Sequence, residues 1–413
     1  MRPPSTRSPV AATILAASFA AASLIAVSCA YAQEKKEEEP PFWAIGKPKA
    51  GPGAQMAPVA APPIPTPADQ LPKLQVPAGF KVEVFQPGLL DARALRRGDK
   101  GTIFVSSLFV AGKIYAIVEK EKGKREVKTI ASGLELPAGI EFRDGSLYVA
   151  TPKKITRYDK IEDNLDNPPA PVDVFTDLPG DVPHGWKFLR FGPDGKLYVP
   201  VGANCNICEP DPAKYAQIFR INADGSGKEI VARGVRNSVG LDFHPKTKQL
   251  WFTDNQRDWL SEDMPLDELN VVKNPGKDNF GYPYCHSGIM TDPQYGWGKS
   301  CADYVKPAVT LGPHAAPLGM KFYTGKSFPS KYRGAIFIAR HGAWNRTKKY
   351  ADVAVAYLDS KSNITKVEPF VTGWVKNNEY VGRPVDILQQ PDGSILISDD
   401  HNGAVYRVSY GRR

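Results

Sequence analysis

A loop histidine is the first residue of this sequence suited to catalysis. His184 lies in the segment Pro183-His-Gly-Trp186, directly before a predicted turn and strand. An imidazole titrates near neutral pH and can remove a proton from a hydroxyl group. A hydrogen-bonded loop histidine without a catalytic part is the plainer interpretation of such a residue. We therefore take His184 as a candidate general base whose role depends on its neighbours.

A second group of polar residues follows further along the chain. The segments are Gly234-Val-Arg236-Asn237, Asn255-Gln256-Arg257-Asp258, Asp267-Glu-Leu-Asn270 and Asp278-Asn-Phe-Gly-Tyr-Pro283. Carboxylates and turn carbonyls concentrated in this way suit Ca²⁺, which accepts oxygen ligands in flexible geometry. The spacing is not that of an EF-hand, so composition indicates a calcium site only as a hypothesis.

Arginine residues recur beside later turns. Arg340 and Arg346 flank His341-Gly-Ala-Trp344, and Arg383 lies in Gly382-Arg-Pro384. A guanidinium group pairs a carboxylate through two parallel hydrogen bonds, so three such groups directed at one site would suit a ligand with several carboxylates. For each arginine taken singly, a solvated surface position is the alternative.

One repeated pattern must position all of these loops. A short apolar strand follows a turn at six places: Gly101-Thr-Ile-Phe-Val, Gly145-Ser-Leu-Tyr-Val, Gly195-Lys-Leu-Tyr-Val, Lys248-Gln-Leu-Trp-Phe, Gly334-Ala-Ile-Phe-Ile and Gly393-Ser-Ile-Leu-Ile. The spacings of 44, 50, 53, 86 and 59 residues are typical of propeller blades. The repeats predict an all-β fold, a six-bladed β-propeller with a long loop insertion between blades four and five, roughly Trp259 to Tyr323. A β-sandwich is the alternative, and it accommodates six repeats poorly.

The N-terminal region predicts export. Arg2 and Arg7 precede an uncharged, Ala-rich stretch, and Ala30-Tyr-Ala32 offers small residues at a cleavage position. Residues 1–32 therefore resemble a signal peptide cleaved near Ala32, which predicts a periplasmic or secreted protein without stable membrane insertion. A transmembrane anchor and a lipoprotein site at Cys29 are the alternatives. Residues 33–75 hold ten Pro and predict a disordered linker, which leaves 76–413 as the catalytic domain.

Four cysteines remain after the predicted cleavage. Their even number in an exported chain indicates two disulfides, which we expect to join Cys205 to Cys208 and Cys285 to Cys301. Sequence alone allows three pairings, and a zinc site is the alternative. The formal charge of +9 includes no concentrated run of Lys and Arg, so a nucleic-acid partner is not expected.

The order of the motifs resembles one family. His184, Phe191-Gly-Pro-Asp-Gly195, Gly234–Asn237, Asp267–Asn270, Asn279–Pro283 and Gly382–Pro384 occur in the order seen in soluble PQQ-dependent sugar dehydrogenases. The similarity spans roughly Val76 to Tyr410 and is greatest to the sorbosone dehydrogenase branch of the glucose dehydrogenase family. It implies an enzyme that oxidises an aldose or sugar aldehyde by hydride transfer to PQQ and passes electrons to an external cytochrome or quinone.

The same resemblance implies residue roles. His184 would be the general base, and Arg236 and Asn237 would contact PQQ, with Arg236 stabilising charge on the quinone oxygen. Carbonyls near Gln256 and Arg257 would hold Ca²⁺ as a Lewis acid. Carboxylates of PQQ would pair with Arg383 and with Arg340 or Arg346. The family's Gln-Gly-Pro is replaced by Gln256-Arg-Asp258, so the ligand assignment is open by a residue or two.

Two other functions fit the same sequence. A Ca²⁺-dependent lactonase on this fold would use acidic side chains as metal ligands and would need no organic cofactor. A non-catalytic propeller would bind glycans or protein through aromatic loops that include Trp297 and Trp344. The sequence identifies neither the sugar, nor the electron acceptor, nor the oligomeric state.

Overall fold

The computed structural model describes residues 64–411, with the exception of 122 and 183. The predicted signal peptide, residues 1–32, and the first part of the predicted linker lie outside the described residues. In the part of the chain that is described, no helix is long and apolar enough to cross a membrane.

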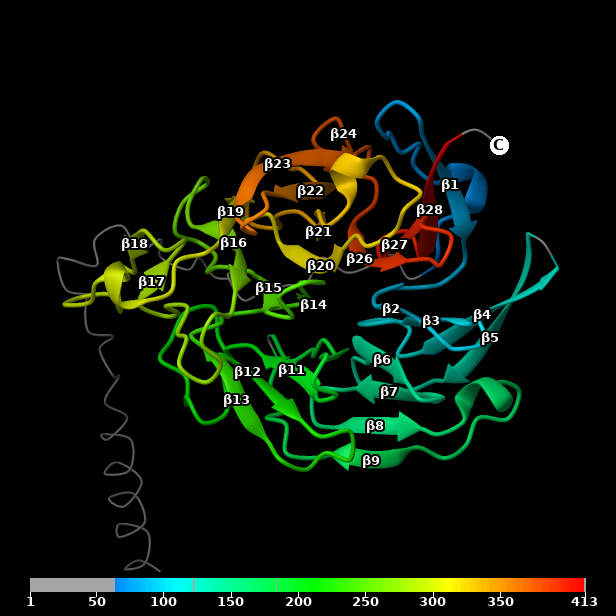
Figure 1. Ribbon diagram of the computed structural model, residues 1–413, viewed down its shortest axis with the longest axis horizontal. Helices are drawn as coiled ribbons and strands as arrows, with labels where there is room; N and C mark the ends of the chain where they lie inside the picture. The colour runs from blue at the N-terminus through cyan, green and yellow to red at the C-terminus, as the bar shows by residue number, and fades with distance from the viewer. Residues whose placement is uncertain (1–63, 122, 183, 412–413) are drawn as a thin grey trace, which may run out of the picture. The chain divides into compact units, whose positions relative to one another are not determined.

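Six four-stranded antiparallel sheets form the propeller, which confirms the predicted fold (Figure 1). In order from the channel outward, the sheets are β2 (Leu95–Arg97), β3 (Ile103–Ser106), β4 (Ile114–Glu121), β5 (Lys124–Ala131); β6 (Gly139–Arg143), β7 (Ser146–Ala150), β8 (Ile155–Tyr158), β9 (Val172–Phe175); β10 (Arg190–Phe191), β11 (Leu197–Val201), β12 (Gln217–Ile221), β13 (Glu229–Arg233); β14 (Gly240–Phe243), β15 (Leu250–Asp254), β16 (Leu266–Val271), β19 (Val309–Pro313); β20 (Pro317–Phe322), β21 (Ile336–Arg340), β22 (Asp352–Leu358), β23 (Ile364–Val371); and β26 (Pro384–Gln389), β27 (Ile395–Asp399), β28 (Ala404–Tyr410), β1 (Phe80–Gln86).

Each of the six predicted apolar strands is the second strand of its blade. The strand β11, for example, is buried along its whole length, because both of its faces are covered by protein. Continuous apolar runs are expected where a sheet is covered on both sides. The Asp-Gly pair before β7 is also recognisable in the sequence. Asp144 and Gly145 both have positive φ, which a tight two-residue hairpin requires.

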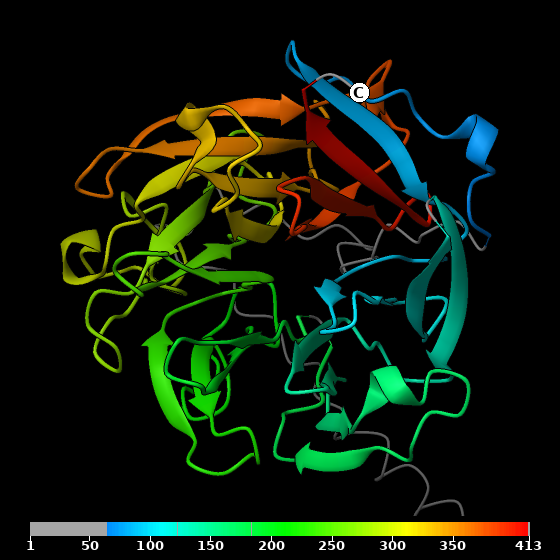
Figure 2. The same cartoon turned by 45° about the vertical axis from the view of Figure 1, so that its right-hand side comes forward.

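The sixth blade is closed by the N-terminal strand. β1 pairs with β28 from Phe80 opposite Tyr410 to Gln86 opposite Val405, as the blue and red strands of Figure 2 show. The chain before β1 also lies on the propeller: Leu71 and Leu74 pack against the core of blades five and six. The folded part therefore begins before the predicted boundary at Val76, because these two leucines find apolar partners that composition does not reveal.

The long insertion differs in place from the prediction. β16 and β19 belong to the same sheet, so residues 272–308 form an excursion inside blade four and not between blades four and five. This excursion contains β17 (Cys285–His286) and β18 (Met290–Thr291). The prediction used only the spacing between the second strands of successive blades. The interval between β15 and β21 contains both the outer strands of blade four and the first strand of blade five, so its length does not show where in the interval the insertion lies. The expected disulfides Cys205–Cys208 and Cys285–Cys301 are both confirmed.

Antiparallel order brings the polar loops to one end of the channel. The start of each first strand lies beside the end of each second strand, because neighbouring strands run in opposite directions. His184, Arg236 and Arg383 precede the first strands β10, β14 and β26, and Asn255 and Asp400 follow the second strands β15 and β27.

Candidate active site

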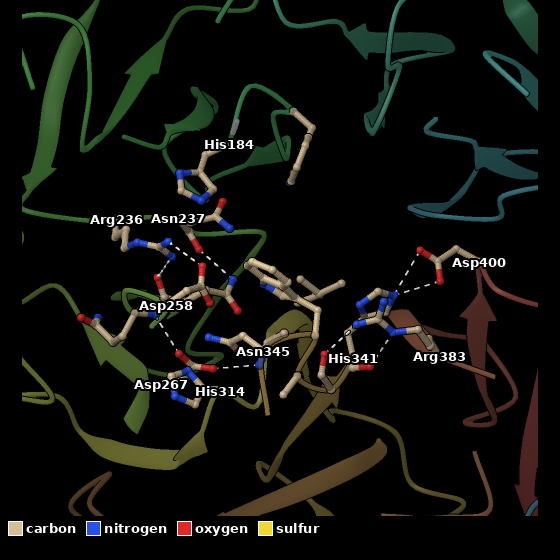
Figure 3. A pocket seen from close by; sticks show the side chains of 18 of the residues that line it. His184, Arg236, Asn237, Asp258, Asp267, His314, His341, Asn345, Arg383 and Asp400 are labelled. Atoms are coloured by element: carbon tan, nitrogen blue, oxygen red, sulfur yellow. Dashed lines mark hydrogen bonds and ion pairs between the residues drawn. The ribbon is translucent and has the colours of Figure 1, made fainter. Parts of the chain in front are cut away.

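A pocket opens where these loops meet (Figure 3). It is partly open to solvent and is lined by both polar and apolar side chains, as small-molecule sites usually are. Its polar lining comprises Arg93, His184, Arg236, Asn237, Asn255, Gln256, Asp258, Asp267, His314, His341, Asn345, Arg383 and Asp400, and its apolar lining includes Leu108, Phe109, Val182, Trp186, Ala316, Leu318, Ala343 and Trp344. Loops from several blades therefore meet around one space.

His184 is held in a single tautomer. Its ring is buried, and its Nδ1 lies 2.7 Å from the carbonyl oxygen of Ala203, which can only accept a hydrogen bond. Nδ1 therefore carries the proton, and Nε2 keeps its lone pair. Burial, followed by the nearby charge of Arg236, lowers the pKa of His184 well below its ordinary value. The residue is thus a neutral base at physiological pH, in a left-handed backbone conformation with φ of 57°.

Arg236 is fixed on three sides. Its Nε donates to the backbone oxygen of Asn206 at 2.8 Å, and its Nη1 donates to the backbone oxygen of Asn255 at 3.0 Å. Its Nη2 pairs with Asp258 Oδ2 at 3.1 Å and also donates to Asn206 Oδ1 at 2.8 Å. A buried guanidinium group with this many partners has little rotational freedom, so its positive charge is held at one place beside His184.

Asp254, the last residue of β15, fixes the backbone at the start of blade four. Its carboxylate accepts the backbone N–H groups of Arg236 at 3.0 Å and Asn237 at 2.7 Å. Burial raises the pKa of Asp254 to about 7, although these hydrogen bonds oppose the rise. The carboxylate thereby sets the direction in which Arg236 and Asn237 enter the pocket.

On the opposite side of the pocket, the buried carboxylate of Asp400 contacts Arg93 and His341. Asp400 accepts hydrogen bonds from Arg93 Nη1 at 2.7 Å and from His341 Nε2 at 2.9 Å. Burial and the charge of Arg383 lower the pKa of His341 to about 4, although Asp400 opposes the change. We conclude that His341 donates to Asp400 as a neutral ring, and that Arg93 is the cationic partner of this carboxylate.

Arg383 is a buried cation without a carboxylate partner. It donates from Nε to the carbonyl of His341 at 3.1 Å and from Nη2 to the carbonyl of Gly342 at 2.6 Å. Its guanidinium group lies over the ring of Tyr380, 4.9 Å from the ring centroid, and among the described residues it forms no direct ion pair. Burial lowers the pKa of Arg383, and the nearby charge of Asp400 opposes this change. A buried charge that is only partly compensated is costly, so this position favours an anionic ligand in the pocket.

Gln256 lies on the pocket wall beside an acid that fixes its backbone. Asp267 accepts the backbone N–H of Gln256 at 2.7 Å and that of Ala316 at 2.8 Å, and burial raises the pKa of Asp267 to about 8. Within the described part of the chain the backbone oxygens of Gln256 and Arg257 accept no hydrogen bond. Two successive carbonyls of this kind are oxygen donors that a Ca²⁺ ion can use.

Three residues predicted for the site have side chains directed elsewhere. Arg340 pairs with Asp352, with its Nε 2.7 Å from Oδ1, and Arg346 pairs with Asp263, with its Nη2 2.7 Å from Oδ1. The side chain of Arg257 is buried against Asp292, with an N–O distance of 2.6 Å. None of the three lines the pocket, so the structure brings together His184, Arg236, Asn237, Gln256 and Arg383 only.

The sequence interpretation missed Arg93, Asp400 and Asn345. Asp400 follows the second strand of blade six, as Asn255 follows that of blade four, so superposing the repeats would have revealed it. Arg93 has no such signal, because only alanines flank it. Asn345 lines the pocket, and neither its Oδ1 nor its Nδ2 has a partner in the described residues.

Comparisons with known proteins find similar chains over nearly the same residues. The family model described as TrAA12-like matches residues 74–411. An uncharacterized protein of Borreliella burgdorferi is 34% identical over 354 residues, which span 82% of this chain and 91% of that protein. The holo form of the pyranose dehydrogenase PQQ domain from Coprinopsis cinerea matches with a TM-score of 0.72 at 19% identity, over 84% of this chain and 98% of that domain. The calcium structure of a Trichoderma reesei enzyme of carbohydrate-active family AA12 matches with a TM-score of 0.68 at 18% identity, over 83% and 98%. At these identities the two solved structures establish a shared fold.

Proposed function

This chain belongs to the TrAA12-like family, and from that premise we propose that it is an exported PQQ-dependent oxidoreductase of sugars. The resemblance to PQQ-dependent sugar dehydrogenases that the sequence indicated is confirmed by the family and its structural neighbours. The observation that carries the proposal is the presence, in one pocket, of a neutral His184 and of Arg383, a buried cation without a direct ion pair.

The chemistry of the pocket fits PQQ, which is a planar quinone with three carboxylates. Arg383 supplies a buried cation for one carboxylate, and Asn345 supplies an unpartnered amide donor. Asn255 Oδ1 is a buried acceptor without a partner. Apolar residues such as Trp186 and Trp344 cover the remaining walls and suit a flat ring system. Arg340 and Arg346, which the sequence also offered, are already neutralised by carboxylates outside the pocket.

His184 and Arg236 have different roles in the proposed reaction. His184 Nε2 takes the proton of the sugar hydroxyl, since its lone pair is free and its Nδ1–H is bound to Ala203. Arg236 would stabilise the negative charge that develops on the accepting oxygen. Apolar side chains such as Trp186 and Leu318 would pack against the substrate. PQQ, when bound, would supply the two-electron acceptor for oxidation of the hydroxyl to a carbonyl.

The proposal also covers the metal ligands, the substrate and the export of the protein. The backbone oxygens of Gln256 and Arg257 would hold Ca²⁺, while Asp267 orients the first of them. The substrate would be an aldose or a sorbosone-like sugar aldehyde, with electrons passed to an external cytochrome or quinone. Export through residues 1–32 is supported by the two disulfides, because such bonds persist in oxidising compartments.

Reconstitution tests the proposal. Apo-protein is incubated with PQQ and Ca²⁺, then mixed with a panel of sugars and an artificial dye acceptor. We expect dye reduction that requires both PQQ and a sugar. Lactone hydrolysis without PQQ would instead identify the lactonase. The described residues contain no group of three or more His, Cys, Asp or Glu placed to hold a metal, so no observation favours that function.

A further inference from the structure

The loop closed by the Cys205–Cys208 disulfide holds the cation of the candidate site. This loop follows β11 and carries Asn206 between the two half-cystines. The backbone oxygen of Asn206 accepts from Arg236 Nε at 2.8 Å, and its side-chain Oδ1 accepts from Arg236 Nη2 at 2.8 Å. One residue therefore supplies two of the contacts that fix the guanidinium group.

Asn206 also holds the counter-ion of that group. Its Oδ1 accepts the backbone N–H of Asp258 at 2.8 Å, and its Nδ2 donates to the backbone oxygen of Asp258 at 3.2 Å. Asp258 in turn pairs with Arg236 through its carboxylate. The amide of Asn206 thus joins the cation and the carboxylate into a single unit.

Two devices fix Asn206 in place. The disulfide closes the loop on either side of it, and Tyr282 from the excursion of blade four bridges the loop. The hydroxyl of Tyr282 donates to the backbone oxygen of Asn206 at 3.3 Å and accepts from the backbone N–H of Cys208 at 3.2 Å. Burial raises the pKa of Tyr282 to about 12, so the phenol remains a donor. Cys205 and Cys208 are partly exposed, whereas Cys285 of the other disulfide is buried.

We propose that Asn206 is a positioning residue for Arg236, and that the Cys205–Cys208 disulfide is a redox-sensitive brace for this residue. The catalytic meaning of the brace rests on the proposed function, whereas its geometry does not. A dithiol reductant gives two electrons and two protons to the disulfide and becomes a cyclic disulfide itself, leaving two cysteine thiols. The opened loop then holds Asn206 only through hydrogen bonds, to Tyr282 and to the Arg236 and Asp258 that it positions.

The first test compares Asn206→Ala with Asn204→Ala in the apo-protein. Asn204 is an exposed amide of the same loop that makes no contact with Arg236, so it is a matched control. The titration of His184 is followed by NMR and assigned with His184→Ala. Because the charge of Arg236 adds to the effect of burial in lowering the pKa of His184, a displaced guanidinium group should raise the titration midpoint in Asn206→Ala. The midpoint should stay unchanged in Asn204→Ala, and an unchanged midpoint in both variants overturns the proposal.

The second test opens the brace without changing Asn206. The wild-type protein is treated with dithiothreitol, and mass spectrometry of alkylated thiols establishes that only Cys205 and Cys208 have been reduced. We expect the His184 midpoint to rise and kcat in the dye assay to fall about 10- to 100-fold, with the sugar KM within about threefold and recovery after reoxidation. The Cys205→Ser/Cys208→Ser variant should behave like the reduced protein.

The outcomes separate this proposal from the proposed function. Wild-type turnover and an unchanged His184 midpoint in the reduced protein would overturn the brace. If the wild type itself reduces no dye with PQQ and sugars, the proposed function fails, and the NMR midpoints still decide whether Asn206 and the disulfide position Arg236.

Discussion

Replacing Arg383 by Met should weaken PQQ binding with little loss of stability. The side chain is buried and forms no direct ion pair with a described carboxylate, and the nearby Asp400 keeps its hydrogen bonds to Arg93 and His341 when Arg383 is removed. Burial lowers the pKa of this guanidinium, which means that the fold disfavours its charge. The gain from removing the charge opposes the loss of its two hydrogen bonds to carbonyl oxygens, so the free energy of unfolding should change by less than about 1 kcal/mol.

Arg383→Met should change the affinity for PQQ much more than it changes the free energy of unfolding. A charged, bidentate contact between a guanidinium and a carboxylate contributes about 2–3 kcal/mol, and about 1.4 kcal/mol corresponds to a factor of ten in Kd. We therefore expect the Kd for PQQ to increase about 30- to 150-fold in Arg383→Met. Titration of apo-protein with PQQ in the presence of Ca²⁺ measures this change.

Arg340→Met is the matched control. It breaks a largely buried pair with Asp352 and leaves that carboxylate without its cation, which costs about 3–5 kcal/mol. Its folded form should bind PQQ like the wild type, while its unfolding transition moves to lower denaturant concentration. The reasoning is refuted if Arg383→Met binds PQQ with wild-type affinity, or if Arg340→Met loses affinity while folded.

Three further predictions concern the remaining parts of the site. His184→Ala should reduce kcat in the dye assay by about 10²- to 10⁴-fold with the Kd for PQQ within about threefold, and wild-type turnover would contradict the base assignment. His341 has a folded pKa of about 4, below the unfolded value of about 6.5, so its neutral form contributes stability above pH 6.5 that is lost as the pH falls to 4. This loss should reach about 3 kcal/mol in urea unfolding, and an equal slope in His341→Asn would disprove it. Asp267→Asn removes a carboxylate that fixes Gln256, so it should increase the Ca²⁺ concentration for half-maximal activity about tenfold, and an unchanged Ca²⁺ requirement would argue against ligation by the Gln256 backbone.

The strand pattern could be predicted because a second strand is covered on both faces. Its sequence is therefore a run of apolar residues after a turn, as in β11, and the run is visible without knowledge of its neighbours. The pairing of β1 with β28 could not be predicted in this way, because it joins the two ends of the folded part. The place of the insertion was also not predictable, since outer strands such as β19 are only partly buried and have no repeated apolar pattern.

The two groups of predicted site residues differ for a physical reason. His184, Arg236 and Arg383 precede first strands, where the backbone turns into the channel, so their position in the repeat already placed them. Arg340 is the last residue of β21, and its partner Asp352 is directly opposite it on β22. That neighbour is set by strand register, which residue types beside a turn do not reveal. Arg346 meets acids from a loop of blade four that lies more than eighty residues away in the sequence.

The cations of the pocket differ in how far neighbouring carboxylates already compensate their charge. Arg236 faces Asp258 and Arg93 faces Asp400, so each of these cations has its own carboxylate. Arg383 contacts two carbonyl oxygens and the ring of Tyr380, and it feels the charge of Asp400 without pairing with it directly, so its own charge is only partly compensated. A fold selected for stability alone would place a neutral side chain there, since burying an uncompensated charge destabilises the native state. Its presence at the pocket wall indicates that the cost is offset when an anion binds, because binding to the native state alone adds to its stability. The least compensated positive charge of the pocket thus lies at Arg383, which gives a multiply charged, planar ligand a defined orientation before His184 acts on the substrate.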